Sequence, residues 1–302
     1  MSPLISIVMA TYNGEKYLRE QVDSLLLQSY PYLEFIFVDD ASTDGTLTIL
    51  RDYAARDSRI QLIENSVNQG YRKTFEKGIL KAKGEFIALS DQDDYWLPSK
   101  ITELANSIGD YSLIYSDSAL VDDSGKFIGK KMSDIKRQIA YSSPLMYTFG
   151  AWAPGHSMLF RKDLLHFALP VVDYVAHDYL IGFAATCAGG ITYLPKSLVH
   201  YRQHATNTIG ANLKNATKPY KTKKERNHLI NLRLQLIYER CPEGDDKVIL
   251  KNFAQACAGY SINDRIKRVI ILMKHHRAML AYKGKSPLGS FLYSFKLLIS
   301  IY

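Results

Sequence analysis

Cysteine is scarce in this sequence. The 302 residues include only three cysteines, Cys187, Cys241 and Cys257, and no two of them form a CxxC pair. Scattered thiols cannot build a disulfide framework, and the common structural zinc sites need paired cysteines. Apolar residues make up 47% of the chain, which is enough for a hydrophobic core. The composition therefore favours a globular protein of a reduced, cytoplasmic compartment.

Long apolar runs are missing as well. The two most hydrophobic stretches, 138–160 and 179–195, are interrupted by prolines and by a glycine pair, respectively. Neither has the character of a membrane span, and the first residues, MSPLISIVMATYN, lack the basic segment and cleavage site of a signal peptide. A Gly-rich phosphate loop is also absent, since TYNGEKY holds one glycine, which disfavours a nucleotidyltransferase.

Charge is distributed unevenly along the chain. Residues 214–302 carry 18 Lys and Arg against 6 Asp and Glu, a net charge of +12, whereas residues 1–213 carry 20 against 24, a net charge of −4. A basic segment on a mildly acidic body indicates an anionic partner, either membrane headgroups or nucleic acid. Aromatic residues do not interleave regularly with the basic ones and no nucleic-acid motif occurs, so we expect no nucleic-acid partner.

Strand-like and helical patterns alternate in the first part of the chain. Four apolar runs predict strands and three amphipathic patterns between them predict helices: strands at 4–10, 33–39, 60–65 and 85–90, helices at 14–28, 43–56 and 71–83. Continuous apolar runs of strand length are typical of a parallel sheet covered on both faces. This order predicts an α/β fold with a doubly wound, mostly parallel sheet.

The second part is less regular. The pattern predicts the following elements: helices near 98–108, 162–168 and 178–188, and strands at 113–121, 191–195 and 198–204, with a hairpin turn at 122–125. Residues 134–157 show no periodicity and are expected to form a mobile loop. From about 222 the pattern is helical to the end, so residues 214–302 are predicted to form a basic helical C-terminal extension.

Acidic side chains follow two of the predicted strands. Asp39 and Asp40 end the second strand, and Asp91, Gln92 and Asp93 follow the fourth. In open α/β sheets ligands bind beyond the carboxyl ends of the strands. Crowded carboxylates repel one another unless a cation compensates them, and a divalent cation held by carboxylates and substrate phosphates is a common solution. The alternative is that DQDD only caps the next helix, because Asp is common in turns.

Two segments carry a family resemblance. SIVMATYNGEKYLREQVDSLLLQSYPYLEFIFVDDASTDGT and NQGYRKTFEKGILKAKGEFIALSDQDD resemble the inverting nucleotide-sugar glycosyltransferases of family 2, and the resemblance continues in order through about residues 1–204. It implies a GT-A fold, a Rossmann-like, mostly parallel sheet flanked by helices. The implied catalytic domain is 1–213, with a nucleotide-sugar half at about 1–95 and an acceptor half at about 96–213.

The resemblance also implies site residues. Tyr12 and Glu15 would lie around the base and ribose of the donor, Asp40 would accept from the pyrimidine N3–H, and Asp91 would approach the ribose. Gln92 is included in this donor-binding set. Asp93 would bind the metal, Mn²⁺ or Mg²⁺, that bridges the donor diphosphate.

Asp178, in VAHDYLIGFAATCAGG, is the implied catalytic base. Such enzymes often have Glu before this acid, whereas His177 precedes it here, which leaves the role of His177 open. A position at the start of a helix would stabilise the ionised carboxylate, because free N–H groups point at it. The alternative is that Asp178 is a plain helix N-cap.

Three further residues have two interpretations each. His204, in VHYRQH, is the candidate third metal ligand or a solvated histidine of an edge strand. Arg72 would reach a donor phosphate or would be an ordinary surface arginine. Trp96 would stack on a sugar ring or would serve as a core or lid residue.

The motif SDQDDYW looks like the version found in bacterial rhamnosyltransferases of surface-polysaccharide synthesis, so dTDP-rhamnose is the favoured donor and UDP-galactose or UDP-glucose the alternative. The Q-x-x-R-W motif of processive synthases is absent, which favours transfer of one sugar to a glycan or lipid-linked glycan acceptor. The basic 264–285 and apolar 287–302 segments suit peripheral attachment to the anionic inner face of the plasma membrane. Packing of these helices on the catalytic body is the alternative, and the two are compatible.

Overall fold

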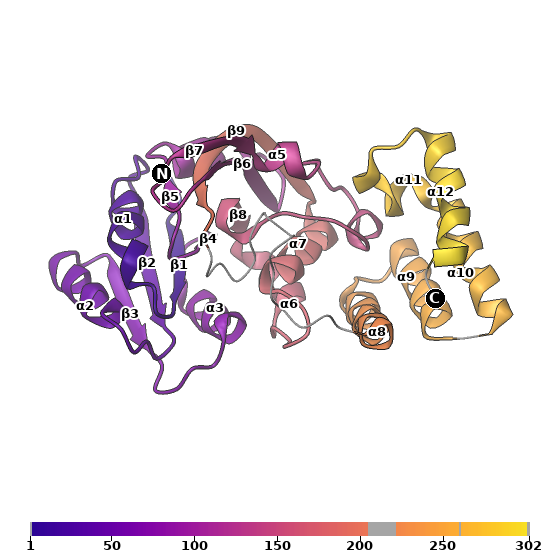
Figure 1. Cartoon of the computed structure of the whole chain (residues 1–302), viewed down its shortest axis with the longest axis horizontal. Helices are drawn as coiled ribbons and strands as arrows, with labels where there is room; N and C mark the ends of the chain where they lie inside the picture. The colour runs from indigo at the N-terminus through magenta and orange to yellow at the C-terminus, as the bar shows by residue number, and fades with distance from the viewer. Residues whose placement is uncertain (1, 205–221, 260, 301–302) are drawn as a thin grey trace.

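The computed structural model describes residues 2–204, 222–259 and 261–300. Within these residues the chain forms a nine-stranded sheet in the order β3-β2-β1-β4-β8-β6-β9-β5, with β7 paired to β6. Figure 1 shows this sheet and its helices in the left and central parts of the molecule, and further helices from the C-terminal part of the chain on the right. The predicted α/β class with a mostly parallel sheet flanked by helices is confirmed.

The first four strands are parallel neighbours. The elements are β1 (Ile5–Thr11), α1 (Glu15–Leu26), β2 (Leu33–Asp39), α2 (Thr46–Arg56), β3 (Ile60–Glu64), α3 (Tyr71–Lys81) and β4 (Phe86–Ser90). β1 pairs in parallel with β2 on one side and with β4 on the other, so the strand order reverses between β1 and β4. Ligands of open α/β sheets bind at such a reversal. The predicted alternation of strands and helices is confirmed, and it puts the ends of β1 and β4 at the expected site.

The second half of the sheet mixes directions. Its elements are β5 (Tyr95–Trp96), α4 (Lys100–Ser107), β6 (Leu113–Val121), β7 (Phe127–Lys131), α5 (Met132–Ile135), β8 (Met158–Arg161), α6 (Leu165–Ala168), α7 (His177–Ala188) and β9 (Ile191–Arg202). β8 runs antiparallel to both β4 and β6 and joins the two halves of the sheet. The two strands expected at 191–195 and 198–204 are one strand, β9, whose irregular register with β6 at Asp117 accommodates the change in pattern.

The sheet has a core on each face, because neighbouring side chains of a strand point to opposite sides. Ile7 of β1 packs in the cluster that contains Leu18 of α1 and Ile101 of α4. Val8, the next residue, packs in the cluster that contains Phe75 of α3 and Phe183 of α7. Helices therefore cover both faces, and the chemistry is confined to the strand ends.

The segment 134–157 is irregular, as expected, but it is packed into the molecule. It contains 3-10 turns at Pro144–Tyr147 and Gly155–Ser157. Tyr141 and Tyr147 are buried, and the Tyr141 backbone pairs with that of Ile191. Large aromatic side chains hold this segment in place without a regular element, which is why no periodicity was visible. The expectation of a loose loop is corrected to that extent.

In the described residues after 222 the chain forms five α-helices: α8 (Lys223–Arg240), α9 (Asp245–Ala258), α10 (Ile262–Lys274), α11 (His276–Met279) and α12 (Pro287–Ser300). They pack on the sheet domain, since Phe149 meets Phe253 edge to face at 5.4 Å between ring centroids and Arg137 donates to the Ala281 carbonyl at 2.7 Å. The predicted boundary between residues 213 and 214 lies outside the described residues. None of the helices described combines the length and the apolar character needed to cross a bilayer.

Candidate active site

The loops after β1 and β2 hold strained backbone at the strand ends. Asn13 (φ 47°) and Ala41 (φ 61°) are the non-glycine residues with positive φ in the described part of the chain. Such conformations cost about 1–3 kcal/mol and concentrate at functional sites. Asn13 is held by its Oδ1, which accepts from the Thr43 N–H at 2.8 Å, and by its own N–H, which donates to Ser42 Oγ at 3.0 Å. The two loops are thus tied together around a fixed shape.

Tyr12 and Gln92 connect the ends of β1 and β4. Gln92 Oε1 accepts from the Tyr12 N–H at 2.8 Å, and Gln92 Nε2 donates to the Tyr12 carbonyl at 3.1 Å. The Tyr12 side chain is 45% exposed, so its ring is available to a ligand. Glu15 Oε2 accepts from the Gly45 N–H at 2.8 Å. The oxygen and the nitrogen of the Gln92 carboxamide both bind the Tyr12 backbone, which gives Gln92 a positioning function.

Asp40 is buried at the end of β2. Its Oδ1 accepts from Asn65 Nδ2 at 2.8 Å and from the Gln69 N–H at 2.9 Å, while its Oδ2 accepts from the Gly70 N–H at 2.8 Å. Asp40 therefore orders the loop that precedes α3. A carboxylate oxygen can accept two hydrogen bonds, so Oδ2 keeps the capacity for one more donor.

The acidic residues after β4 lie at two positions. Asp91 and Asp94 form an inner cluster with His156, and Asp93 forms an outer pair with His204. Asp94 is fully buried: its Oδ1 accepts from the Arg202 N–H at 3.1 Å, and its Oδ2 has no hydrogen-bond partner. Asp91, Asp94 and His156 can each place a ligand atom within 4.8 Å of the others. Burial, followed by the charges of Asp93 and Asp178, raises the pKa of Asp91 to about 7. The negative charge of this cluster is therefore not fully compensated by the protein.

Lys100 supplies part of the compensating charge from inside the protein. Its side chain is fully buried, its Nζ donates to the His156 carbonyl at 2.6 Å, and it lies 2.9 Å from the centroid of the Trp96 ring. Burial lowers the pKa of Lys100 well below its ordinary value, while the nearby Asp94 and Asp91 carboxylates oppose that shift. In its charged form Lys100 in turn opposes the rise in the pKa of both Asp91 and Asp94. Trp96 is itself fully buried, so the sugar-stacking interpretation of this tryptophan is wrong and the core interpretation holds.

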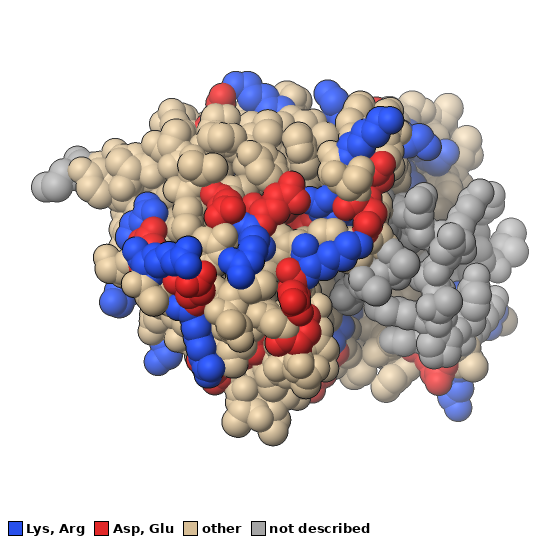
Figure 2. Space-filling view, turned by 60° about the vertical axis from the view of Figure 1, so that its left-hand side comes forward, with Lys and Arg blue, Asp and Glu red and all other residues tan. Residues whose placement is uncertain are grey.

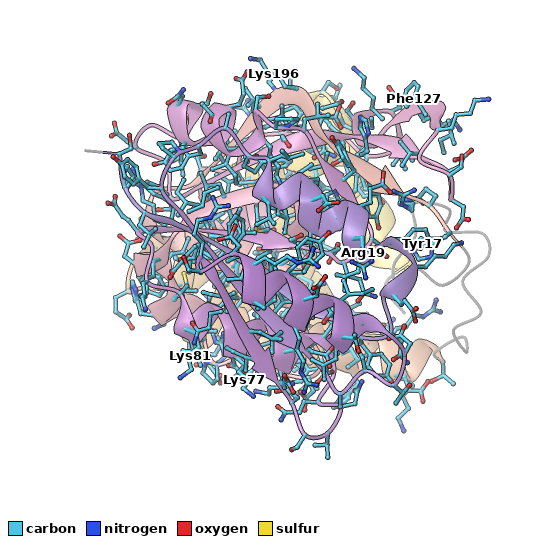
Figure 3. All side chains as sticks on the ribbon, turned by 90° about the vertical axis from the view of Figure 1, so that its left-hand side faces the viewer. Tyr17, Arg19, Lys77, Lys81, Phe127 and Lys196 are labelled. Atoms are coloured by element: carbon cyan, nitrogen blue, oxygen red, sulfur yellow. The ribbon has the colours of Figure 1, made fainter. Side chains whose placement is uncertain are left out.

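Asp93 and His204 form the outer pair. Asp93 Oδ2 lies 2.9 Å from His204 Nε2, and their side chains are 18% and 8% exposed. The His204 ring also packs against Tyr17 of α1 at 4.8 Å between centroids, and Figure 3 labels Tyr17 at the edge of the domain. The structure therefore brings together the two side chains predicted from the sequence as metal ligands, although they are 111 residues apart.

Arg202 holds the acidic turn in place and was not predicted as a site residue. It is buried, its Nε donates to the Asp93 carbonyl at 3.0 Å, and its guanidinium reaches Glu20 Oε2 at 2.6 Å. Its backbone N–H is the partner of Asp94. The sequence feature that could have identified Arg202 was its position two residues before His204, on the same face of the strand predicted at 198–204.

Asp178 lies in the first turn of α7, close to the strand ends. Its Oδ1 accepts from the Tyr179 N–H at 2.8 Å. A Cβ atom built on Gly155 would lie 3.5 Å from the Asp178 Cβ and 3.8 Å from Leu89 Cδ1 of β4. These are ordinary van der Waals distances, so position 155 lies in packing contact with both the first turn of α7 and β4. Asp178 is one of the charges that raise the pKa of Asp91, so the two carboxylates are close enough to interact electrostatically.

His177 and Arg72 lie near these carboxylates. His177 is buried, stacks on Phe75 at 4.2 Å between centroids and meets Tyr71 edge-on at 5.7 Å. Burial lowers the pKa of His177 to about 4, so the ring is neutral at physiological pH and anchors the first turn of α7. Arg72 has a buried Nε atom without a hydrogen-bond partner, which is a free donor beside the site.

The donor set suits a hard divalent cation. Asp93 and His204 offer a carboxylate and an imidazole at the outer edge, and Asp91 and Asp94 offer two further carboxylates at the inner position, where Asp94 Oδ2 is unpartnered. Oxygen and imidazole ligands of this kind fit Mn²⁺ or Mg²⁺, which also keep sites for phosphate oxygens. The inner position is less suited, because Lys100 already lies beside it.

Comparisons with known proteins show which family this chain resembles. Residues 6–166 match the family model described as glycosyl transferase family 2. The chain is 29% identical over 218 residues to the putative glycosyltransferase EpsH of Bacillus subtilis. The aligned region covers 69% of this chain and 63% of EpsH. The chain is 36% identical over 135 residues to the putative teichuronic acid biosynthesis glycosyltransferase TuaG of the same organism, covering 42% and 52%. The chain thus spans about two-thirds or less of the length of these relatives.

Solved structures show the same fold. The structure of S. aureus TarS 1–349 in complex with UDP-GlcNAc superposes with a TM-score of 0.62 at 18% identity, over 97% of this chain and 91% of that one. The mannosyltransferase PcManGT from Pyrobaculum calidifontis, in complex with GDP-Man and Mn²⁺, gives a TM-score of 0.53 at 18% identity, over 100% and 81%. At these identities the likeness establishes the fold alone.

Proposed function

This chain belongs to glycosyl transferase family 2, and from that premise we propose that it is a metal-dependent inverting enzyme that moves one sugar from a nucleotide-sugar donor to a glycan hydroxyl. The observation that carries the proposal is the meeting of two groups of carboxylates at the reversal of the strand order. Asp91 and Asp93 follow β4, and Asp178 reaches the same space from α7. Inverting transfer needs a donor site and a base on opposite sides of one reacting carbon.

The donor side is formed by the loops after β1, β2 and β4. We assign the exposed Tyr12 ring and Glu15 to the base and ribose, and the remaining lone pair of Asp40 Oδ2 to the N3–H of a pyrimidine. Asp91 would approach the ribose, and Gln92 would hold the Tyr12 backbone that carries the ring. Arg72, with its unpartnered Nε, would contact the diphosphate.

Asp93 and His204 would hold the divalent cation, with Asp91 beside them. When bound, such a cation stabilises the negative charge that develops on the departing nucleoside diphosphate. The chain supports this arrangement through Arg202, which fixes the Asp93 carbonyl, and through Lys100, which stabilises the inner carboxylates.

Asp178 would act as the base. It would take the proton from the acceptor hydroxyl as that oxygen attacks the anomeric carbon from the face opposite the diphosphate, so that the bond to the diphosphate breaks and the configuration inverts. The start of α7 favours the ionised carboxylate, and the neutral His177 ring beneath it keeps the turn in place. We therefore assign His177 a positioning function.

We propose dTDP-rhamnose as the donor, with UDP-galactose or UDP-glucose as the alternative, because of the SDQDDYW sequence at the end of β4. Donor hydrolysis without acceptor should be fastest with dTDP-rhamnose in a panel of dTDP-, UDP- and GDP-sugars with Mn²⁺. Binding of dTDP or UDP should raise Tm only when Mn²⁺ is present. A GDP-sugar preferred over every pyrimidine donor would contradict the role of Asp40.

The acceptor would be a surface glycan or its lipid-linked precursor, which places the enzyme at the inner face of the plasma membrane. The relation to TuaG, described as acting in teichuronic acid biosynthesis, supports a polysaccharide product. The charge of residues 214–302 supports attachment to anionic lipid. The same region would not bind nucleic acid.

Mn²⁺ binding should weaken as the pH falls below 7. Because the pKa of Asp91 is raised to about 7, its carboxyl is mostly protonated at pH 6, and a cation must displace that proton. The apparent Kd should rise by up to about tenfold per pH unit for one displaced proton. Calorimetric titrations at pH 6 and pH 8, in two buffers with different ionisation enthalpies, measure both the affinity for Mn²⁺ and the proton released on binding. Asp91→Asn should reduce the pH dependence, leaving the part that comes from the His204 ligand; a dependence as steep as that of the wild type would assign the displaced proton to another group.

A further inference from the structure

Helix α10 exposes a row of isoleucines. Ile262, Ile266 and Ile270 are 74%, 50% and 45% exposed, and each is one turn of helix from the next. Residues four apart lie on one side of an α-helix, so the three side chains form a continuous stripe. The side of the helix that adjoins Ile262 is used for packing, where Val269 and Leu272 are buried. Single exposed apolar residues are ordinary, whereas an aligned row of β-branched ones is not.

Basic side chains border this stripe on both sides. At 100° per residue, Arg265 lies on one side of the isoleucines, and Lys267 and Lys274 lie on the other. All three are exposed. The acidic residue of the helix, Asp264, turns back to its own N-terminus, where its carboxylate accepts from Ser261 Oγ at 2.6 Å. An apolar centre between two basic margins is the pattern of a helix that lies in a membrane interface.

Helix α12, which neighbours α10, adds exposed apolar residues at the same end of the molecule. Leu288 and Leu292 of α12 are 69% and 58% exposed and are also one turn apart, while Ser290 and Ser294 are buried. α12 packs against α10 and α11. In Figure 1 these helices lie at the end of the molecule farthest from β3 and α2. By contrast, the face in Figure 2 shows acidic and basic side chains interspersed, without an extended patch of one sign.

We propose that the α10 face, defined as Ile262, Ile266 and Ile270 with Arg265, Lys267 and Lys274 at its margins, is the surface that lies on an anionic bilayer. The isoleucines would enter the interface and the basic groups would meet the lipid phosphates. The charges of this face indicate that its partner is an anionic bilayer. A second copy meeting this face would bring like charges together at both margins, and a nucleic acid would leave the isoleucines in water.

The α10 face changes which part of the C-terminal extension carries the contact. From the sequence, the apolar segment 287–302 was the expected anchor, but the described part of α12 turns its buried serines to the neighbouring helices. Deleting this helix would uncover the packed sides of α10 and α11, so a loss of vesicle binding in a truncated chain would not identify the contact. Substitutions on the exposed stripe leave that packing intact and are the sharper test.

The inference rests on the proposed function only in that a lipid-linked acceptor gives the enzyme a reason to be at the membrane. The test compares full-length protein with Ile262→Gln/Ile266→Gln/Ile270→Gln, in flotation with vesicles of phosphatidylcholine containing about one-third phosphatidylglycerol. We expect the substitutions to weaken binding by about tenfold or more, because the apolar insertion is lost. Leu27→Gln/Val67→Gln, which removes two apolar residues that are 64% and 62% exposed on the sheet domain, should bind as wild type does.

A charge variant completes the design. Lys267→Gln/Lys274→Gln should also weaken binding, and the residual binding should lose part of its salt dependence, since screening acts on charge. Unchanged binding of the isoleucine variant, no binding of the wild type, or a wild-type dimer that the isoleucine variant converts to monomer would each overturn the proposal. Donor hydrolysis in detergent-free buffer is measured in parallel. If no variant hydrolyses any donor while the vesicle results hold, the proposed function fails and the membrane surface stands.

Discussion

Asp178→Asn should lower kcat by about 10²–10⁴-fold, the range contributed by a positioned general base. Donor affinity should stay close to that of wild type, because Asp178 reaches the site from α7, whereas the proposed donor contacts come from the loops after β1, β2 and β4. The expected signature is thus a loss of turnover at unchanged nucleotide binding. Initial rates of transfer and a titration of the nucleotide with Mn²⁺ measure the two quantities.

The geometry makes asparagine a conservative replacement. Its Oδ1 can still accept from the Tyr179 N–H, as the aspartate does at 2.8 Å, so the first turn of α7 should keep its structure. What is lost is the negative charge and the capacity to take a proton. Asp178 is the second residue of α7 and Ala176 is its N-cap, so the plain N-cap interpretation of Asp178 is wrong. Unchanged Tm would separate the chemical function from a structural one, since a merely structural role predicts little change in rate.

Asp173→Asn is the matched control. Asp173 is exposed, lies five residues before Asp178 in the segment that leads into α7, and should be replaceable without effect. A loss of nucleotide binding in Asp178→Asn would remove this residue from the role of base. Equal losses in both variants would point to a general effect on the segment.

The parallel half of the sheet could be predicted because its signal is local. Runs such as LEFIFVD are continuous, and their length and composition are sufficient to assign β2 and its neighbours. The acidic residues were found for a related reason: they directly follow such runs, and the chemistry of crowded carboxylates is specific. Asp93 and His204 were paired only through the family resemblance, yet the fold does bring them together.

What could not be predicted depends on contacts between distant residues. Arg202 holds the acidic turn by bonds to Asp93 and to Glu20, which is 182 residues away in sequence. Lys100 resembles an ordinary helix lysine until its burial between Trp96 and the carbonyl of His156 is seen. β8 has only four residues within an irregular region, so its apolar pattern is too short to distinguish from a loop. Burial, rather than sequence pattern, distinguishes these residues.

Asp93→Ala should reduce transfer to about 1% of wild type or less, in line with the 10²–10³-fold cost of removing one group that stabilises transition-state charge. The side chain is 18% exposed at the outer edge of the cluster, so its removal should leave the fold intact. The Mn²⁺-dependent rise of Tm with nucleotide should be lost along with activity. Asp110→Ala, at an exposed position away from the cluster, serves as the control. Full activity of the wild type in EDTA would contradict the metal assignment.

The pairing with His204 makes a stricter test possible. If Asp93 and His204 hold one cation, either substitution removes most of the same interaction, and the double variant Asp93→Ala/His204→Ala should be little worse than Asp93→Ala alone. If His204 only donates a hydrogen bond to Asp93 Oδ2, at the observed 2.9 Å, His204→Ala should retain Mn²⁺ binding and lose at most a modest part of the rate. Losses that multiply in the double variant would mean that the two residues act independently. In that case the cation would lie with Asp91 and Asp94, at the inner position beside Lys100.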